Sequence, residues 1–160
     1  MARVKKLSCK PLNGYRHCVG VEVNIAQRVE VVFDLATHIQ KMHRFFPDYV
    51  FESACERFAK DCIYSVSERG RRNKATYKIV EFVPNRYYSG EMISGGSIFQ
   101  KFRYQHYFIG NGHQTISREF VHYSLKYGML GTLLEPIAEA IITKRLRYAH
   151  ARLKDVSEKR

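Results

Sequence analysis

The segment "IFQKFRYQHYFI", residues 98–109, carries the side chains best suited to acid–base chemistry. Alternate side chains of a strand point to opposite faces, so Tyr104 and His106 share one face and Lys101 and Arg103 share the other. A phenol or an imidazole can transfer a proton when a partner lies within hydrogen-bond distance. A buried histidine more often only needs a hydrogen-bond partner, so a structural role for His106 stays open.

Arg118 is a second polar candidate, in a segment that we predict to be the last strand, residues 114–126. Arg118 and His122 share one face of that strand, and Glu119 lies on the other. If Arg118 faces inward, its guanidinium offers a two-pronged donor for a carboxylate or a phosphate. If it faces outward, we expect it to pair with a glutamate. Acid–base chemistry by these side chains is therefore one alternative function.

Motifs for other chemistries do not occur in the sequence. It has no H-E-x-x-H, no G-x-S-x-G, no phosphate-binding loop and no dinucleotide-binding motif. His38 and His43 lie five residues apart, a spacing that does not place them on one face of a helix. We therefore predict no catalytic nucleophile, no metal site and no cofactor.

The cysteines and the N-terminus bear on the cellular compartment. Cys9, Cys18, Cys55 and Cys62 form no C-x-x-C pair, and a chain of this size does not need disulfides, so we expect four reduced thiols. No apolar run reaches the roughly 18 residues of a membrane span, and no apolar run follows the basic start "MARVKKLSCK". We expect a cytoplasmic protein without a transmembrane segment.

Hydrophobic periodicity predicts the elements that would position these groups. Residues 16–25 alternate as a half-buried strand, and residues 27–39 and 40–46 have helical spacing, with Pro47 ending the second helix. A period of two then predicts six strands, separated by Gly, Pro, Asn or Asp: residues 49–58, 62–69, 73–83, 86–93, 98–109 and 114–126. Successive strands joined by tight turns form an antiparallel sheet.

The last third of the chain predicts one long helix that begins near Pro136. Its apolar stripe is expected to consist of Leu134, Ala138, Ile141, Ile142, Leu146, Ala149 and Leu153. We therefore predict an α+β fold with about seven strands in the order β-α-α-β6-α. One domain would span residues 1–160, with a basic N-terminal tail over residues 1–13.

This order of elements resembles the START-like helix-grip superfamily, which includes Bet v 1-type proteins, polyketide cyclases and coenzyme Q-binding proteins. The resemblance covers about residues 16–155. It rests on "VEVNIAQRVEVVFDLATHIQKMHRFFP", "YKIVEFVPNRYYSGEMISG", "FRYQHYFIGNGHQTISREFVHY" and the C-terminal helix. Family members often carry Trp where this chain has Phe46 or Tyr104, and this chain has no Trp. The resemblance implies a curved sheet around the helix and carriage or sequestration of a lipid, a quinone or a polyketide-like molecule. It also implies a polyketide cyclase/dehydratase-like enzyme as the first alternative.

A curved sheet around a single helix leaves an apolar cavity with a few polar groups, which is the usual form of a ligand site. We expect the two short helices to close one mouth of this cavity. Purely structural roles for Phe45 and Phe46 stay an alternative. The candidate ligand-binding residues are Phe45, Phe46, Tyr77, Ile79, Phe102, Tyr104, His106, Phe108, Arg118 and Ile141.

The formal net charge of +12 favours association with polyanions. Two basic segments stand out, "RGRRNK" at residues 69–74 and "KRLRYAHARLK" at residues 144–154. Such segments are usually solvated surface, and we expect at most weak electrostatic binding to nucleic acid or to an anionic membrane. A nucleic-acid- or ribosome-associated module is the second alternative.

Overall fold

The computed structural model describes residues 3–96, 98–126 and 128–159. Within these residues the chain forms eight strands, two α-helices and one short 3₁₀ helix, η1. In chain order they are β1 (Lys5–Leu7), β2 (His17–Ile25), α1 (Val29–Thr37), η1 (Ile39–Arg44), β3 (Tyr49–Ser53), β4 (Ile63–Glu68), β5 (Lys74–Val83), β6 (Tyr87–Ser94), β7 (Phe99–Asn111), β8 (Gln114–Leu125) and α2 (Gly128–Glu158).

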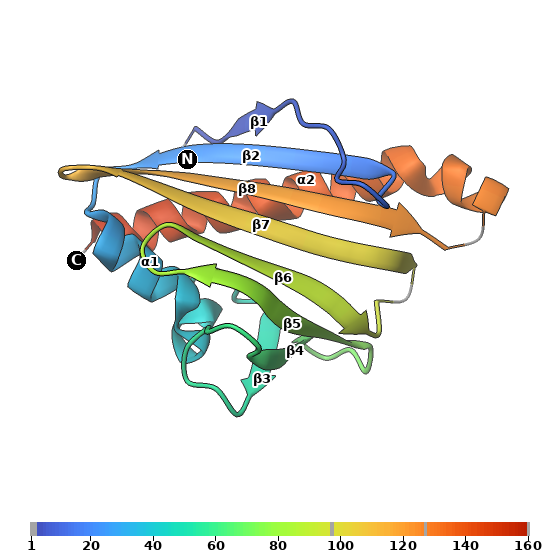
Figure 1. Ribbon diagram of the computed structural model, residues 1–160, viewed down its shortest axis with the longest axis horizontal. Helices are drawn as coiled ribbons and strands as arrows, with labels where there is room; N and C mark the ends of the chain where they lie inside the picture. Colours follow the sequence, from blue (N-terminus) through green and yellow to red (C-terminus); the bar gives the residue numbers. More distant parts are fainter. Residues whose placement is uncertain (1–2, 97, 127, 160) are drawn as a thin grey trace.

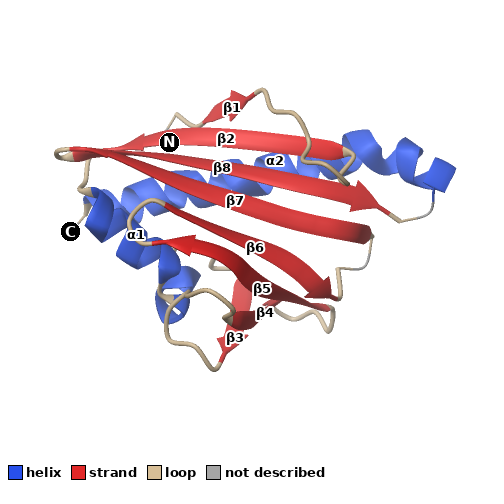
Figure 2. Ribbon diagram, viewed as in Figure 1, coloured by secondary structure: helices blue, strands red, loops and turns tan. Residues whose placement is uncertain are grey.

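The strands form one antiparallel sheet in the order β1-β2-β8-β7-β6-β5-β4-β3. The sheet curves, and α2 runs along one of its faces, while α1 and η1 lie near one end of the sheet (Figure 1). Figure 2 shows the strands as one layer with the long helix beside it. The predicted helix-grip fold is confirmed, with eight described strands instead of seven.

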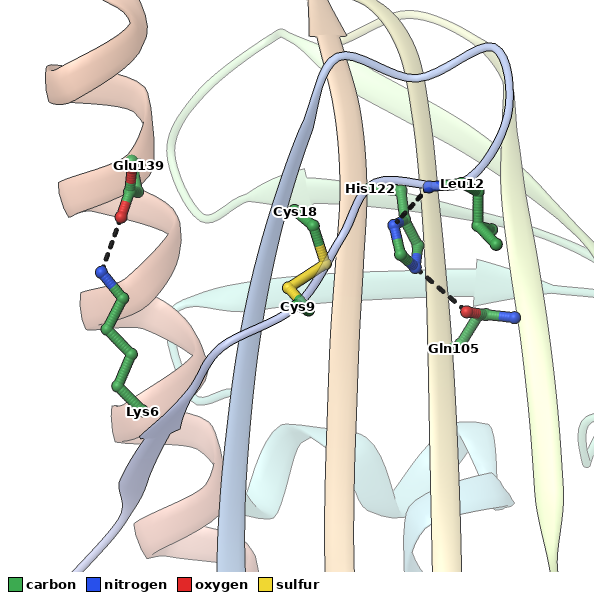
Figure 3. The surroundings of a disulfide bond; sticks show 7 residues. All are labelled: Lys6, Cys9, Leu12, Cys18, Gln105, His122 and Glu139. Carbon is green, nitrogen blue, oxygen red and sulfur yellow. Dashed lines mark hydrogen bonds and ion pairs between the residues drawn. A yellow bond between two sulfur atoms is a disulfide. The ribbon is translucent and has the colours of Figure 1, made fainter.

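β1 lies in the segment that we predicted to be a basic tail. Its three residues pair with β2, and Lys6 forms an ion pair of 2.6 Å with Glu139 on α2 (Figure 3). A sequence of only three residues, "KKL", is too short to display a period of two, so it carries no strand signal. Residues 1 and 2 lie outside the described residues.

A disulfide joins Cys9, just after β1, to Cys18 on β2, with their Cα atoms 5.8 Å apart (Figure 3). The prediction of four reduced thiols is therefore wrong for this pair, whereas Cys55 and Cys62 are free. The pairing arises because the chain leaves β1 and returns alongside it, an arrangement that cysteine spacing alone does not reveal. Disulfides persist mainly in oxidising compartments, so a cytoplasmic location, which stays a prediction, requires this bond to be reduced most of the time.

Opening this disulfide should lower the free energy of unfolding by about 2–3 kcal/mol, because the bond closes a short loop and restricts the unfolded chain. The measurement is urea unfolding of the Cys9→Ser/Cys18→Ser variant under non-reducing conditions. Cys55→Ser is the matched control, since it removes a partly buried free thiol and no cross-link. Equal stability of the double variant and the native protein would contradict the expectation.

A β-bulge in β5 decides which side chains reach the inner face of the sheet. The register shifts between Ile79 and Glu81, so Ile79 is fully buried while the carboxylate of Glu81 reaches Arg103 on the outer face, 2.6 Å away. Phe82 then packs on Phe33 of α1, with ring centroids 5.6 Å apart. The bulge therefore supplies the partner that Glu81 would lack if the alternation of β5 were unbroken.

α2 starts at Gly128, about two turns before the predicted start, and Pro136 lies inside it. The helix has apolar residues on two faces. Ala138, Ile142 and Leu146 are buried, whereas Ile141 is 46% exposed. Because each helical residue turns by about 100°, Ile141 lies on a different face from Ile142, and its predicted place in the buried stripe is wrong. The same holds for Leu134, which is 39% exposed. None of the helices in the described ranges combines the length and apolarity needed to cross a membrane.

Candidate functional site

An apolar cavity of about 160 Å³ lies between the end of η1, the inner face of the sheet and α2. Most of its wall is aromatic, so the cavity presents ring faces and edges to any occupant. The apolar lining consists of Met42, Phe45, Phe46, Tyr49, Phe51, Phe58, Tyr64, Val66, Tyr77, Tyr88, Phe102, Tyr104, Ala149 and Leu153. Three further lining residues are His106, Glu119 and His150.

Six of the ten predicted site residues line this cavity: Phe45, Phe46, Tyr77, Phe102, Tyr104 and His106. Ile79 and Phe108 are buried in the adjoining core and do not line it. The predicted orientation of residues 98–109 is confirmed. Tyr104 and His106 face inward, while Arg103 forms ion pairs with Glu81 and Glu91 on the outer face of the sheet.

Arg118 points away from the cavity. It stands directly opposite Glu22 of β2, forms an ion pair with that carboxylate, and is 41% exposed. The inward orientation is therefore wrong, and the alternative of an outer pair with a glutamate is confirmed. The same alternation turns Glu119 inward.

Two tyrosines form a buried hydrogen-bonded pair in the cavity wall, with the hydroxyls of Tyr64 and Tyr104 2.6 Å apart. Burial raises the pKa of both phenols above the ordinary value, so both keep their protons. The ring of Tyr104 crosses over Gly90, its partner on β6. A Cβ atom added at Gly90 would lie 2.3 Å from the Tyr104 hydroxyl, so only glycine leaves room for this arrangement.

Gly90→Ala should therefore lower the free energy of unfolding by about 1–3 kcal/mol, because the new methyl group displaces the Tyr104 ring. Urea unfolding measures the loss. In the Tyr104→Ala background the ring is gone, so the same glycine substitution should cost almost nothing. An equal loss of unfolding free energy in both backgrounds would mean that Gly90 is needed for its backbone conformation and not because the Tyr104 ring lies so close to it.

The polar end of the cavity is a cluster of His106 on β7, Glu119 on β8 and His150 on α2. Nδ1 of His106 lies 2.9 Å from the Tyr88 hydroxyl, and its Nε2 lies 2.7 Å from the Ser117 hydroxyl. Both nitrogens of His106 therefore have partners, one donating and one accepting.

His150 and Glu119 are less well satisfied. Nδ1 of His150 donates to the Leu146 carbonyl at 3.0 Å, which leaves Nε2 as a buried acceptor without a hydrogen-bond partner in the structure. The Glu119 carboxyl lies 3.8 Å from this Nε2 and 4.0 Å from Nδ1 of His106, and it forms no hydrogen bond with the described residues. A buried polar atom without a partner is costly, so this end of the cavity favours a polar occupant.

All three groups of this cluster are neutral near pH 7. Burial raises the pKa of Glu119 to about 8 and lowers that of His150 to about 4. Burial, followed by the nearness of His150, lowers the pKa of His106 well below its ordinary value. The cavity thus presents a protonated carboxyl as a donor and an unpaired imidazole nitrogen as an acceptor.

The cluster has the residue types of a metal site, and its candidate ligand atoms lie within 4.8 Å of one another. However, a metal ion bound to His106 would have to displace either Tyr88 or Ser117 from its ring. The geometry therefore fits hydrogen bonding or proton exchange with a bound molecule better than metal coordination.

No protein-family model and no curated protein matches this sequence. Solved structures do match it. The aromatase/cyclase Zhui from Streptomyces sp. R1128 superimposes with a TM-score of 0.78 at 12% identity, covering 90% of this chain and 94% of that one. A START superfamily protein from Mycobacterium smegmatis gives 0.73 at 13% identity, covering 90% and 99%. Truncated norcoclaurine synthase from Thalictrum flavum gives 0.70 at 12% identity, covering 88% and 92%.

The chain therefore has the START-like helix-grip fold. Structural superposition at such low sequence identity shows the fold alone, so the function has to be inferred from the site.

Proposed function

We propose that the protein binds a small hydrophobic or amphipathic molecule in the cavity, for carriage or sequestration. The observation that carries this proposal is the pairing of an aromatic wall with two unsatisfied polar groups, Glu119 and Nε2 of His150, at one end. Ligand sites typically combine an apolar wall with a few such convergent polar groups.

The size and chemistry of the cavity narrow the ligand class. Cavities of about 150 Å³ accept molecules of the size of benzene. The volume here, about 160 Å³, therefore suits one ring, and any longer chain would extend through the mouth. An oxygen on that ring can accept a hydrogen bond from protonated Glu119, and a hydroxyl can donate to His150. A quinone or phenol ring, or the ring-sized end of a polyketide-like molecule, fits this description, as does a lipid with a carbonyl group.

Equilibrium titration tests the proposal with two probes, a water-soluble short-chain benzoquinone and a medium-chain fatty acid. The chain has no Trp, and five tyrosines line the cavity, so intrinsic tyrosine fluorescence reports binding. We expect saturable one-to-one binding of at least one probe. Ala149→Phe fills the cavity and should weaken binding at least tenfold, whereas Ala59→Phe, at an exposed position outside the cavity and its mouth, should not. If neither probe binds, or if Ala149→Phe binds both normally, the proposal fails.

A second candidate is an acid–base enzyme of the cyclase or dehydratase type. It is favoured by the placement of Glu119, whose carboxyl lies 3.8 Å from Nε2 of His150 and 4.0 Å from Nδ1 of His106 and forms no hydrogen bond with the described residues. Burial at this position raises the pKa of Glu119 to about 8. Such a group donates a proton near pH 7 and accepts one above pH 8. In this second function, Glu119 would act as the acid or the base toward a bound carbonyl compound.

Hydrogen exchange tests the second candidate. The protein is incubated in D₂O with a small aromatic ketone, and NMR measures deuterium entering the carbon next to the carbonyl. Glu119 would take the C–H proton to leave an enolate, exchange that proton for a deuteron from D₂O, and return the deuteron to the same carbon, which restores the carboxylate. Exchange should rise with pH through about 8, where half of the Glu119 carboxyl is ionised, and level off above it, and Glu119→Gln should abolish it. Exchange at the rate of the buffer alone would leave binding as the function of the site.

A further inference from the structure

The solvent side of α2 carries a second apolar stripe that the cavity does not use. Ile137 and Ile141 are 57% and 46% exposed, and Tyr148 is 41% exposed. At about 100° per residue these side chains share one face of the helix, together with Leu133, which is 74% exposed. Four large apolar side chains along 16 residues of one helix face are thus left exposed, and large exposed apolar surfaces mark interaction sites.

Basic side chains border this stripe. An open groove runs along α2, and its lining includes Ile141 and Tyr148. Five cations line the same groove, against three carboxylates, Asp48, Glu68 and Glu139. The cations are Arg3, Lys6, Lys144, Arg145 and Arg147. Glu139 is already paired with Lys6 and Glu68 with Arg145, which leaves an excess of positive charge facing solvent.

Both basic segments of the sequence meet at this groove. The hairpin between β4 and β5 is anchored to its edge, because the backbone N–H of Arg69 donates to the carbonyl of Asp48 at 2.8 Å, and Asp48 lines the groove. Arg69, Arg71 and Arg72 are exposed on this hairpin. The C-terminal basic segment supplies Lys144 from α2 itself. Two segments far apart in sequence thus place their charge beside one apolar stripe.

The groove adjoins the mouth of the ligand cavity. Phe46 and Tyr49 line both the cavity and the groove, so they form the boundary between the two. Arg145 on the groove side lies 5.6 Å from the centre of the Tyr49 ring. A molecule leaving the cavity past Phe46 would therefore emerge beside the apolar stripe of α2.

We propose that this face of α2, with the basic hairpin beside it, docks on the surface of an anionic lipid membrane. Amphipathic helices with an apolar face and flanking Lys and Arg lie in the membrane interface, and anionic headgroups attract the basic flank. A second copy of this chain is the poorer occupant, because the groove would bring its excess cations against a like-charged patch. The inference rests on the proposed cavity function, since docking would place the mouth at a source of hydrophobic ligand.

Vesicle flotation tests the apolar part of this surface, with ligand-free protein and vesicles of phosphatidylcholine alone or with about one third phosphatidylserine. We expect binding to the anionic vesicles and little binding to the neutral ones. The Ile137→Ser/Ile141→Ser variant should bind at least tenfold more weakly, because the stripe no longer enters the interface. Ile109→Ser is the matched control. Ile109 is 44% exposed on β7, outside the groove, so binding should be unchanged.

Charge reversal tests the basic part. Each basic residue near an anionic surface contributes about fivefold to binding, so Lys144→Glu/Arg72→Glu should lose about 25-fold or more. Lys60→Glu reverses an exposed charge outside the groove and should have a much smaller effect. Binding of the native protein should also weaken steeply as salt rises.

Three results would overturn the proposal: no binding to anionic vesicles, equal binding by the stripe variant, or a dimer in analytical ultracentrifugation that Ile137→Ser/Ile141→Ser dissociates. Tight binding to RNA that survives both the stripe variant and high salt would assign the surface to nucleic acid instead. The cavity-filling Ala149→Phe variant distinguishes a failure of membrane docking from a failure of ligand binding in the cavity. It should bind vesicles normally while it loses the cavity ligand, so failure of docking does not imply failure of the cavity function.

Discussion

Glu119→Gln should stabilise the protein by about 4–5 kcal/mol above pH 8 and leave its stability near pH 4 almost unchanged. The native state holds a proton on this carboxyl up to about pH 8, because the charged form would be buried and has no hydrogen-bond partner among the described residues. The unfolded chain loses the same proton near pH 4.5. Between these values the unfolded state is favoured progressively, by about 1.4 kcal/mol per pH unit.

The sign of this effect is opposite to that of a surface carboxylate in an ion pair, whose contribution is lost at low pH. Native stability should fall from about pH 4.5 to about pH 8 and then level off as far as Glu119 is concerned. Glutamine keeps the shape of the protonated acid and does not titrate, so this fall should disappear. The measurement is urea unfolding of both proteins from pH 4 to pH 9.

The exposed Glu30 on α1 provides the control, since Glu30→Gln should follow the native pH profile. If the profiles of Glu119→Gln and the native protein coincide, the carboxyl is ionised in the folded state. The neutral donor that we assign to the polar end of the cavity would then be wrong.

The neighbouring phenylalanines 45 and 46 should differ sharply when each is replaced with alanine. Phe45 is 5% exposed and belongs to the core, so Phe45→Ala should cost about 3–5 kcal/mol of unfolding free energy. Phe46 is only partly buried and forms the boundary between the cavity and the outer groove. Phe46→Ala should cost less than half as much and should speed the release of a bound probe.

Stopped-flow release of the benzoquinone or fatty-acid probe, together with urea unfolding, separates the two roles. The ring of Phe46 packs on Tyr49 and Phe51, with centroid distances of 5.9 and 5.8 Å, so its loss opens the wall at the mouth. A large stability loss in Phe46→Ala with unchanged release would make Phe46 an ordinary core residue. Faster release with modest destabilisation identifies it as the gate.

The fold was predictable because its signals are local and repeated. Alternation over residues 98–109 correctly oriented Tyr104, His106 and Arg103, since the reverse orientation would bury two charges without partners. Helical spacing likewise identified Ala138, Ile142, Leu146 and Leu153 as buried. β1 was not predicted because its three residues are too few to show the two-residue periodicity of a strand. The Cys9–Cys18 disulfide was missed for the same reason, since β1 brings Cys9 next to β2.

The polar end of the site was harder to predict because its members come from three elements. Glu119 lies on a strand that the sequence alone does not orient, although the opposite charges of Glu22 on β2 and Arg118 on the neighbouring β8 were a usable signal for an outer pair. His150 follows Leu146 by four residues and therefore lies on the buried face of α2. Its approach to Glu119 depends on how α2 sits on the sheet, which no local pattern encodes.

Native mass spectrometry of protein purified without detergent or organic solvent tests the cavity function most directly. We expect an additional mass that leaves on activation and corresponds to one small molecule per chain, and extraction should identify a compound that carries a ring or a carbonyl. Ala149→Phe should lack this mass, and Ala59→Phe should retain it. An additional mass that persists in Ala149→Phe would place the ligand outside the cavity and contradict the central claim, as would a native protein that carries none and binds neither probe.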